Sequence, residues 1–198
     1  KMNEAVIVST ARTPIGKAYK GAFNNTHGAT LAGHAVKKAV EIAGIDPSTI
    51  EDCLIGCAMP EGATGGNIAR QIAIRGGLPV TTAGATINRF CSSGMQAITM
   101  AAQRIMSNEL DVCVAGGLES ISLVQNEHQN NFMEKEDWIN ENKPELYYSM
   151  IQTAEVVSKR YNIPREEQDE YGLQSQQRMA NAQQSGYLDK EIFPLETI

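Results

Sequence analysis

The sequence predicts an α/β protein built on a mixed, mostly parallel sheet with flanking helices. Short apolar runs alternate along the chain with longer segments of helical periodicity, and short connections join the two. Hydrophobic residues make up 42% and charged residues 20% of the 198 positions, near the average for globular chains. Such alternation is typical of βαβ units, in which neighbouring strands run parallel.

Four apolar segments are predicted to be the strands of this sheet. Each is short and is bounded by turn-forming residues. The first is rich in β-branched side chains and is expected to be buried. In chain order the four predicted strands are Glu4–Thr10, Cys53–Ala58, Ala83–Asn88 and Val112–Ala115.

Helical periodicity separates these strands. The predicted helices are Gly28–Ala43, Asn67–Gly76 and Ser92–Ser107, with a helical turn at Asp46-Pro47. The last helix has the clearest pattern. Its inward face is expected to consist of Met95, Ile98, Ala102, Ile105 and Met106.

The composition changes in the last third of the chain. Residues Glu127–Glu145 are polar and mixed in charge, which predicts a long solvated excursion or a subunit-contact loop. Helical periodicity then returns over Met150–Tyr161 and Arg165–Gln184, with Pro164 separating the two helices.

Charge and cysteine usage exclude several classes of protein. The net charge is −6 without a block of basic residues, so nucleic acid is not a predicted partner. No apolar run is long enough to predict a membrane span. The cysteines at 53, 57, 91 and 113 are irregularly spaced, which favours free thiols in a reducing, cytoplasmic setting. Cys53 and Cys57 lack a second Cys/His pair at ligand spacing, so no metal site is predicted.

Cys91 is the candidate nucleophile. It follows a predicted strand and comes directly before Ser92-Ser93-Gly94 and a long helix, so it lies at a strand-to-helix turn. Backbone N–H groups and the dipole at a helix start favour the thiolate, which is the reactive form. The small residues after it leave room for an attached acyl group. The residues alone leave open a second interpretation, a buried structural cysteine, which is the role predicted for the other three.

Four ordered stretches of the chain resemble the thiolases, the acetyl-CoA acyltransferases, and together they span nearly all of it. The segment around Cys91, NRFCSSGMQAI, resembles the acyl-accepting cysteine motif of that family. The resemblance implies a thiolase-like layered fold with part of a helical loop domain. The other three stretches are Ala11–Gly16, Ala115–Ser120, and Thr153–Glu155 followed by Pro164–Asp169.

The resemblance implies a thioester exchange at Cys91. The thiolate attacks the keto carbon of a 3-ketoacyl-CoA, acetyl-CoA leaves, and a second CoA thiol collects the shortened acyl chain. The backbone N–H of Cys91 is the implied donor to the developing oxyanion. Coenzyme A enters as a substrate and no cofactor is implied. The implied partners are acyl-CoA, CoA, the C-terminal half of the enzyme and further copies in a homo-oligomer (a dimer or tetramer).

Parts of the family pattern have no match here. The family also uses an activating histidine and an acid/base cysteine, both in its C-terminal half, and no residue of this chain resembles either. The histidines at 27, 34 and 128 are predicted to be ordinary surface or helix residues. Residues 2–120 are therefore expected to form the N-terminal domain with the nucleophile elbow. Residues 121–198 would be an incomplete loop domain, with the C-terminal domain outside this chain.

Met150 matches the family's pantetheine-pocket methionine and is a candidate substrate-binding residue. The family usually has glycine directly after that methionine, whereas this chain has Ile151, which puts the pocket in doubt. A methionine at helical spacing is also typical of a helix core, so both interpretations stay open.

Several functions compete with thiolytic cleavage. Arg89, Phe90 and Gln96 favour the fatty-acid-degrading branch over an acetoacetyl-CoA-forming acetyl-CoA acetyltransferase. A β-ketoacyl synthase is less favoured, since small residues and threonine usually precede its cysteine. The alternative from another class is a non-catalytic half-enzyme or a lipid- or subunit-binding module.

Overall fold

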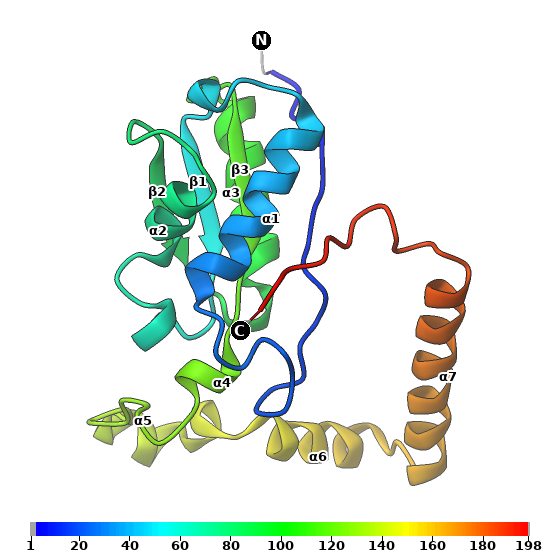
Figure 1. Ribbon diagram of the computed structural model, residues 1–198. Helices are drawn as coiled ribbons and strands as arrows, with labels where there is room; N and C mark the ends of the chain where they lie inside the picture. The colour runs from blue at the N-terminus through cyan, green and yellow to red at the C-terminus, as the bar shows by residue number, and fades with distance from the viewer. Residues whose placement is uncertain (1–2, 198) are drawn as a thin grey trace. The chain divides into compact units, whose positions relative to one another are not determined.

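The computed structural model describes residues 3–197, so residues 2 and 198, which bound the predicted domains, lie outside the described range. The chain divides into two compact units (Figure 1). The first unit runs up to Gln129 and resumes at Glu191, and the second is Asn130–Lys190.

A three-stranded parallel sheet is the centre of the first unit. Its strands are β1 (Asp52–Gly56), β2 (Ala83–Ile87) and β3 (Cys113–Gly117), in the order β2-β1-β3 (Figure 1). The register places Gly56 beside Ile87 on one side and Gly117 on the other. All three strands therefore end at one edge, and the segments that follow them begin close together.

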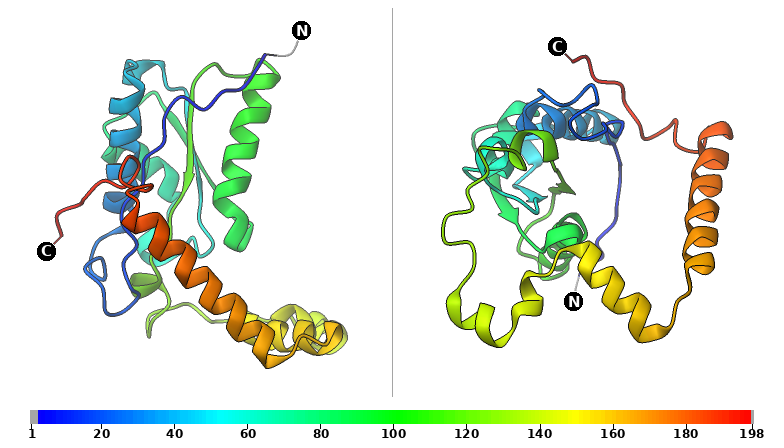
Figure 2. Two further views of the ribbon diagram at one scale, coloured as in Figure 1. Left: turned by 90° about the vertical axis from the view of Figure 1, so that its right-hand side faces the viewer. Right: turned by 90° about the horizontal axis from the view of Figure 1, so that it is seen from below.

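Helices cover both faces of the sheet, as a βαβ layout requires (Figure 2). One face carries α1 (Gly28–Ala43) and α2 (Ile68–Arg75), and the other carries α3 (Ser93–Met106). The expected helices and the last three expected strands are confirmed to within about two residues at each end, apart from Cys57 and Ala58, which follow β1 as loop. Gly44 ends α1 in a left-handed conformation with φ 65°, which glycine adopts readily.

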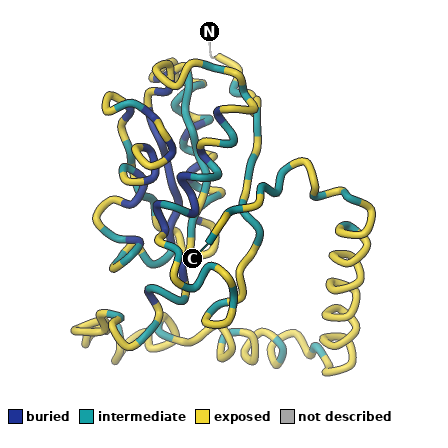
Figure 3. Tube along the Cα trace, viewed as in Figure 1, coloured by how far each residue is buried: buried dark blue, intermediate teal, exposed yellow. Residues whose placement is uncertain are grey.

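Most of the hydrophobic core lies between the sheet and the helix pair α1 and α2 (Figure 3). The alternating side chains of β1 that point to this side are Cys53 and Ile55. Each helix contributes aliphatic residues along one side, and these cover the sheet and complete the core. Its buried members are Ala29, Ala32, Val36, Val40, Ile50, Cys53, Ile55, Cys57, Ile68, Ala69, Ile72, Ala73 and Leu78.

The core on the opposite face of the sheet is smaller, and the helix contributes small residues to it. Ala97 and Ala101 of α3 pack on Leu54, with Ile87, Met100, Cys113 and Ala115 partly buried around them. The inward face predicted for this helix was wrong. Met95, Ile98 and Met106 are exposed because the small side of the helix lies on the sheet, where it permits a closer approach than large side chains would.

The buried strand predicted over Glu4–Thr10 was also wrong. The segment is neither a strand nor buried, and the Ile7 side chain is 76% exposed. Its fixed points are the Asn3 N–H, which donates to the Met106 carbonyl at 3.3 Å, and the Ser9 hydroxyl, which donates to the Ala39 carbonyl at 2.8 Å. A strand needs a partner ladder, and the sheet of β2, β1 and β3 forms none with this segment.

Short elements connect the main ones in this unit. Asp46 caps the helical turn predicted after α1, which is the 3₁₀ helix η1 (Pro47–Thr49). A single parallel bridge joins Arg12 to Ile192, so the end of the described chain lies beside the Ala11–Gly16 stretch. The remaining short helices of the first unit are η2 (Gly62–Thr64), η3 (Phe90–Ser92) and α4 (Ile121–Val124).

The second unit is helical. Its main helices are α6 (Met150–Tyr161) and α7 (Arg165–Gln184), which confirms both predicted helices and the break at Pro164. The polar segment before them includes α5 (Asp137–Asn142) and the start of the 3₁₀ helix η4 (Pro144–Tyr147), so it is more ordered than a plain excursion. None of these helices contains a buried residue. Across residues 3–197, no helix has the length and apolar character to cross a membrane.

Candidate active site at Cys91

The candidate site lies at the edge where the three strands end. In parallel α/β sheets, ligands bind outside the carboxyl ends of the strands, since the loops that follow them gather there. The segment after β2 contains Cys91, the segment after β1 contains Ala58, and the segment after β3 contains Glu119. Side chains from the segments after β2 and β3 contact the backbone of the segment after β1.

The turn from β2 into α3 is sharp and strained. Phe90, directly before Cys91, has φ 46°, a left-handed conformation that bulky residues adopt rarely. Two polar side chains hold the turn. The Oδ1 of Asn88 accepts the Phe90 N–H at 2.9 Å, and the Ser93 hydroxyl accepts the Arg89 N–H at 2.9 Å while donating to the Phe90 carbonyl at 2.5 Å. The predicted elbow is therefore present.

Cys91 itself lies in η3 and is the only exposed cysteine of the four. Among the hydrogen bonds within residues 3–197, none uses the Cys91 N–H as a donor. An exposed sulfur beside a free N–H can approach a carbonyl carbon while the N–H meets its oxygen. A buried structural role for this residue does not fit its exposure.

The other three cysteines have different surroundings. Burial raises the pKa of the Cys53 thiol to about 12 and that of Cys113 to about 12. Burial also raises the pKa of Cys57, with the Glu119 carboxylate adding to the effect. These three thiols therefore stay protonated near neutral pH, which suits the structural role predicted for them.

Three glycines set the start of α3 directly on the sheet. A Cβ added to Gly56 at the end of β1 would lie 2.2 Å from the Ser93 carbonyl carbon. A Cβ on Gly117 at the end of β3 would lie 3.2 Å from the Cα of Gly94. Because backbone meets backbone here, the absence of side chains fixes the distance between the start of α3 and the sheet, and with it the position of Cys91.

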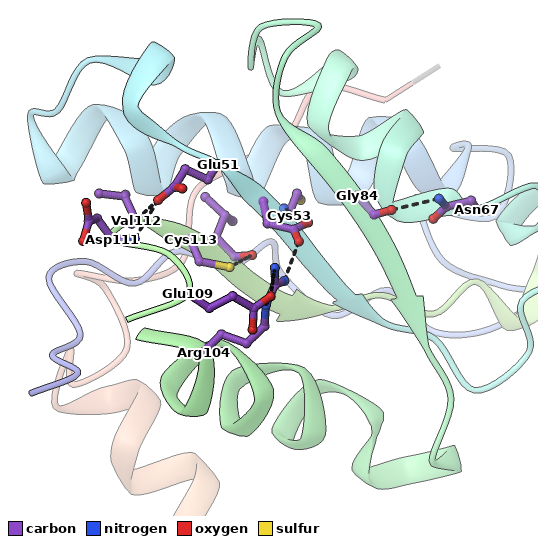
Figure 4. Close-up of polar contacts among 11 residues, drawn as sticks. Glu51, Cys53, Asn67, Gly84, Arg104, Glu109, Asp111, Val112 and Cys113 are labelled. Carbon is purple, nitrogen blue, oxygen red and sulfur yellow. Dashed lines mark hydrogen bonds and ion pairs between the residues drawn. The ribbon is translucent and has the colours of Figure 1, made fainter. Parts of the chain in front are cut away.

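An ion-pair network fixes the other end of α3 (Figure 4). Arg104 Nη1 lies 2.6 Å from Asp52 Oδ2, and Arg104 Nη2 lies 2.7 Å from Glu109 Oε1. The Glu109 and Asp52 carboxylates raise the pKa of Arg104 further above its usual range. Asp52 is buried at the start of β1, so the pair joins the last turn of α3 to the sheet. Helix α3, which begins two residues after Cys91, is thus held at both ends.

Glu119 and Asn88 hold the loop after β1 from its two sides. The Glu119 carboxylate accepts the Ala58 N–H at 2.9 Å and the Met59 N–H at 3.2 Å. From the β2 side, Asn88 Nδ2 donates to the Ala58 carbonyl at 3.1 Å. Both side chains lie within stretches that resemble the thiolases, yet the sequence alone assigned them no role. The available signal was a polar residue within two positions of the end of each of two parallel strands.

Met150 belongs to the second unit and Cys91 to the first. Met150 is the first residue of α6, directly after the N-cap Ser149, and its side chain is 71% exposed. Its neighbour Ile151 is exposed as well. An exposed first-turn methionine is not a helix-core residue in this structure. Its predicted contact with substrate stays a prediction.

The three histidines lie apart from the elbow in the chain. His27 caps α1, where its Nδ1 accepts the Ala29 N–H at 3.1 Å. His34 lies within α1, and His128 is exposed beside Glu127. Among residues 3–197, no group of three or more His, Cys, Asp and Glu side chains is arranged to hold a metal ion.

Comparison with known proteins identifies the family. Residues 5–198 match the model of the thiolase N-terminal domain. The chain is 43% identical over 195 residues to a 3-ketoacyl-CoA thiolase of Bacillus subtilis, covering 98% of this chain and 49% of that protein. It is 37% identical to an acetyl-CoA acetyltransferase of Chromobacterium violaceum, covering 97% of this chain and 51% of that protein.

A solved structure agrees. The crystal structure of the Bacillus anthracis acetyl-CoA acetyltransferase matches 97% of this chain and 50% of its own, with a TM-score of 0.82 and 36% identity. The chain thus spans about half the length of the curated relatives it matches. A family model that covers nearly the whole chain, together with this structural match, shows that the chain belongs to the thiolase family.

Proposed function

We propose that the protein containing this chain is an acyltransferase that cleaves 3-ketoacyl-CoA through a thioester on Cys91. The observation that carries the proposal is the exposed Cys91 at a strained elbow, with its own N–H donating to no acceptor within residues 3–197. Coenzyme A is a substrate in this proposal and no cofactor is needed.

The proposed reaction has two halves. The Cys91 thiolate adds to the keto carbon, and the bond between the alpha and beta carbons then breaks. The electron pair goes to the alpha carbon, which takes a proton and leaves as acetyl-CoA. The sulfur of CoA next adds to the Cys91 thioester, its proton goes to a base, and Cys91 leaves as a thiolate. The acid and the base are proposed to come from residues outside this chain.

Negative charge develops on the carbonyl oxygen in both halves. The Cys91 N–H is proposed to donate to it, since a fixed donor costs no reorganisation when the charge appears. The α3 N-terminus directly behind Cys91 adds partial positive charge on the same side. Met150 is proposed to contact the acyl or pantetheine part of the substrate.

Two further parts of the proposal concern direction and setting. The relatives include both a 3-ketoacyl-CoA thiolase and an acetyl-CoA acetyltransferase, so the condensing direction is the second candidate. Arg89, Phe90 and Gln96 favour cleavage. We propose that the protein works in the cytoplasm as a homo-oligomer. This chain is proposed to contact the C-terminal half of the enzyme.

Steady-state kinetics of the full-length protein test this function. With acetoacetyl-CoA and CoA as varied substrates, the proposal predicts the parallel double-reciprocal lines of a ping-pong mechanism. Cys91→Ser should lower kcat on the order of a thousandfold or more, because the covalent route is lost. Cys113→Ala is the matched control and should keep its activity.

Two outcomes would refute the proposal. An active protein whose Cys91→Ser variant keeps its kcat would have another nucleophile. A folded full-length protein with no thiolysis or condensation of any acyl-CoA would instead favour the non-catalytic binding module.

A further inference from the structure

We infer that Asn88 is a positioning residue for Cys91, because it links the elbow to the loop after β1, which Glu119 fixes from the other side. The inference rests on the proposed role of Cys91 as the acyl acceptor. Asn88 acts through the backbone and does not touch the reacting atoms.

Both ends of the Asn88 amide are used. Its Oδ1 accepts the Phe90 N–H at 2.9 Å, and its Nδ2 donates to the Ala58 carbonyl at 3.1 Å. The amide orientation follows from these partners, since an N–H requires an acceptor and a carbonyl requires a donor. One short side chain therefore joins the residue before the nucleophile to a neighbouring strand's loop.

That loop is itself fixed. The N–H of Ala58 donates to the Glu119 carboxylate at 2.9 Å, and the N–H of Met59 donates to it at 3.2 Å. Ala58 is thus held by Glu119 from the β3 side and by Asn88 from the β2 side. These contacts connect the backbone at Phe90, which follows β2, to the segments that follow β1 and β3.

Phe90 needs such a support. Its left-handed φ of 46° is unfavourable for a bulky residue, and its side chain is 71% exposed, so packing does not hold it in place. The dihedrals of Phe90 set the direction of the next peptide group, which contains the Cys91 N–H. If Phe90 relaxed to a negative φ, that N–H and the Cys91 sulfur would turn together, away from the geometry that the reaction requires.

Asn88→Ala and Asn88→Ser separate the two hydrogen bonds. Alanine removes both. A serine hydroxyl can still accept the N–H two residues on, but it is too short to reach the Ala58 carbonyl. The serine variant therefore keeps the local turn and loses only the link to the β1 loop.

Asn67→Ala is the control. Asn67 donates through Nδ2 to the Gly84 carbonyl at 2.9 Å (Figure 4) and accepts the Thr86 hydroxyl at 2.9 Å, so both ends of its amide are also used, but on β2 and not at the elbow. Asn67 also has φ 52°, so its replacement by alanine should cost at least as much stability as that of Asn88. It therefore reports on structural damage alone.

Kinetics of the full-length protein provide the first test. Asn88→Ala should lower kcat by about 10- to 100-fold with KM within about twofold, since misplacing a reacting group by about an ångström has that effect. Asn88→Ser should fall between Asn88→Ala and the wild type, and Asn67→Ala should keep the wild-type kcat. A wild-type kcat in Asn88→Ala, or an equal loss in Asn67→Ala, would overturn the inference.

The second test does not depend on activity. The distance between the amide proton and Hα of Phe90, measured by NMR from their NOE, is shorter at positive than at negative φ and so reports the sign of φ. We expect a positive φ in the wild type and in Asn67→Ala, and a negative φ in Asn88→Ala. If Asn88→Ala kept the positive φ, the inference would fail even with Cys91 as the acyl acceptor. If the wild type formed no thioester, the proposed function would fail while the φ measurement still decided the role of Asn88.

Discussion

The two faces of the sheet are built in different ways. On the α1 and α2 side, aliphatic side chains such as Ile55, Ile68 and Ile72 close a large core. On the α3 side, the buried members are Leu54, Ala97 and Ala101, and the helix start meets glycine backbone. The first face supplies most of the apolar burial, and hence most of the stability. The second fixes the position of one helix end, and that end is where Cys91 lies.

The largest effect is expected on the α1 and α2 side. Ile72 is fully buried, so Ile72→Ala should lower the free energy of unfolding by about 2–5 kcal/mol through lost burial and a cavity. Urea unfolding measures this. Below the unfolding transition, the Cys91 elbow should keep its geometry and the rate at which Cys91 reacts with iodoacetamide. A changed rate in the folded variant would break the separation between the two faces.

A smaller stability effect with a larger effect on the site is expected at Gly56. Its added Cβ would collide with the Ser93 backbone, which cannot rotate away as a side chain can. Gly56→Ala should therefore destabilise the protein by about 2–3 kcal/mol and displace the start of α3. The control is Gly116→Ala on β3, where an added Cβ meets nothing within 4 Å. Equal changes in the iodoacetamide rate of Cys91 in both variants would contradict the glycine contact.

The pH dependence of stability tests whether both faces of the sheet exclude water from their buried thiols. The pKa of Cys53, facing α1 and α2, is raised to about 12 by burial, and so is the pKa of Cys113, facing α3. The folded state therefore holds these protons while the unfolded state loses them. Each thiol's contribution to stability is complete below about pH 9 and is lost as the pH rises from about 9 to about 12.

Urea unfolding at about pH 8 and pH 10 measures this loss. The fall in stability over that interval should be smaller by about 1 kcal/mol in Cys53→Ala and in Cys113→Ala than in the wild type. If only the Cys53 variant differed, water would reach the α3 face and the two faces would differ in hydration as well as in packing.

The smallest effect is expected on the outer side of α3. Met95 and Ile98 are exposed within the described chain, so Met95→Gln and Ile98→Gln should change the free energy of unfolding of this chain by less than about 0.5 kcal/mol. Ala97→Gln, between them and fully buried, is the contrasting variant and should be strongly destabilising. A large loss in both outer variants would mean that the predicted inward face was right after all.

The elements that the sequence predicted correctly are those that local pattern decides. The helix Gly28–Ala43 and the strand Ala83–Ile87 have clear periodicity and clear stops, and the elbow at Cys91 follows from a strand that turns directly into a helix. The errors involve partners distant in sequence. The apolar run Glu4–Thr10 was expected to be a strand, but whether a segment pairs with a sheet edge depends on residues distant in sequence, which no local pattern reveals.

The errors at α3 and in the site have a similar origin. Hydrophobicity placed the large residues of α3 inward, whereas the glycines at 56 and 117 select the small side. The roles of Asn88 and Glu119 depend on which strand ends are neighbours, and therefore on the strand order β2-β1-β3. Motif resemblance singled out Cys91 but not the side chains that hold its turn.

Trapping the acyl group tests the central claim, that Cys91 is the acyl acceptor, most directly. The full-length protein is mixed with acetoacetyl-CoA, quenched in acid, digested and analysed by mass spectrometry. We predict an acetyl group on the peptide that contains Cys91, its loss when CoA is added before the quench, and no adduct in Cys91→Ser. An active protein that carried the acetyl group on another residue, or that formed no adduct, would contradict the account.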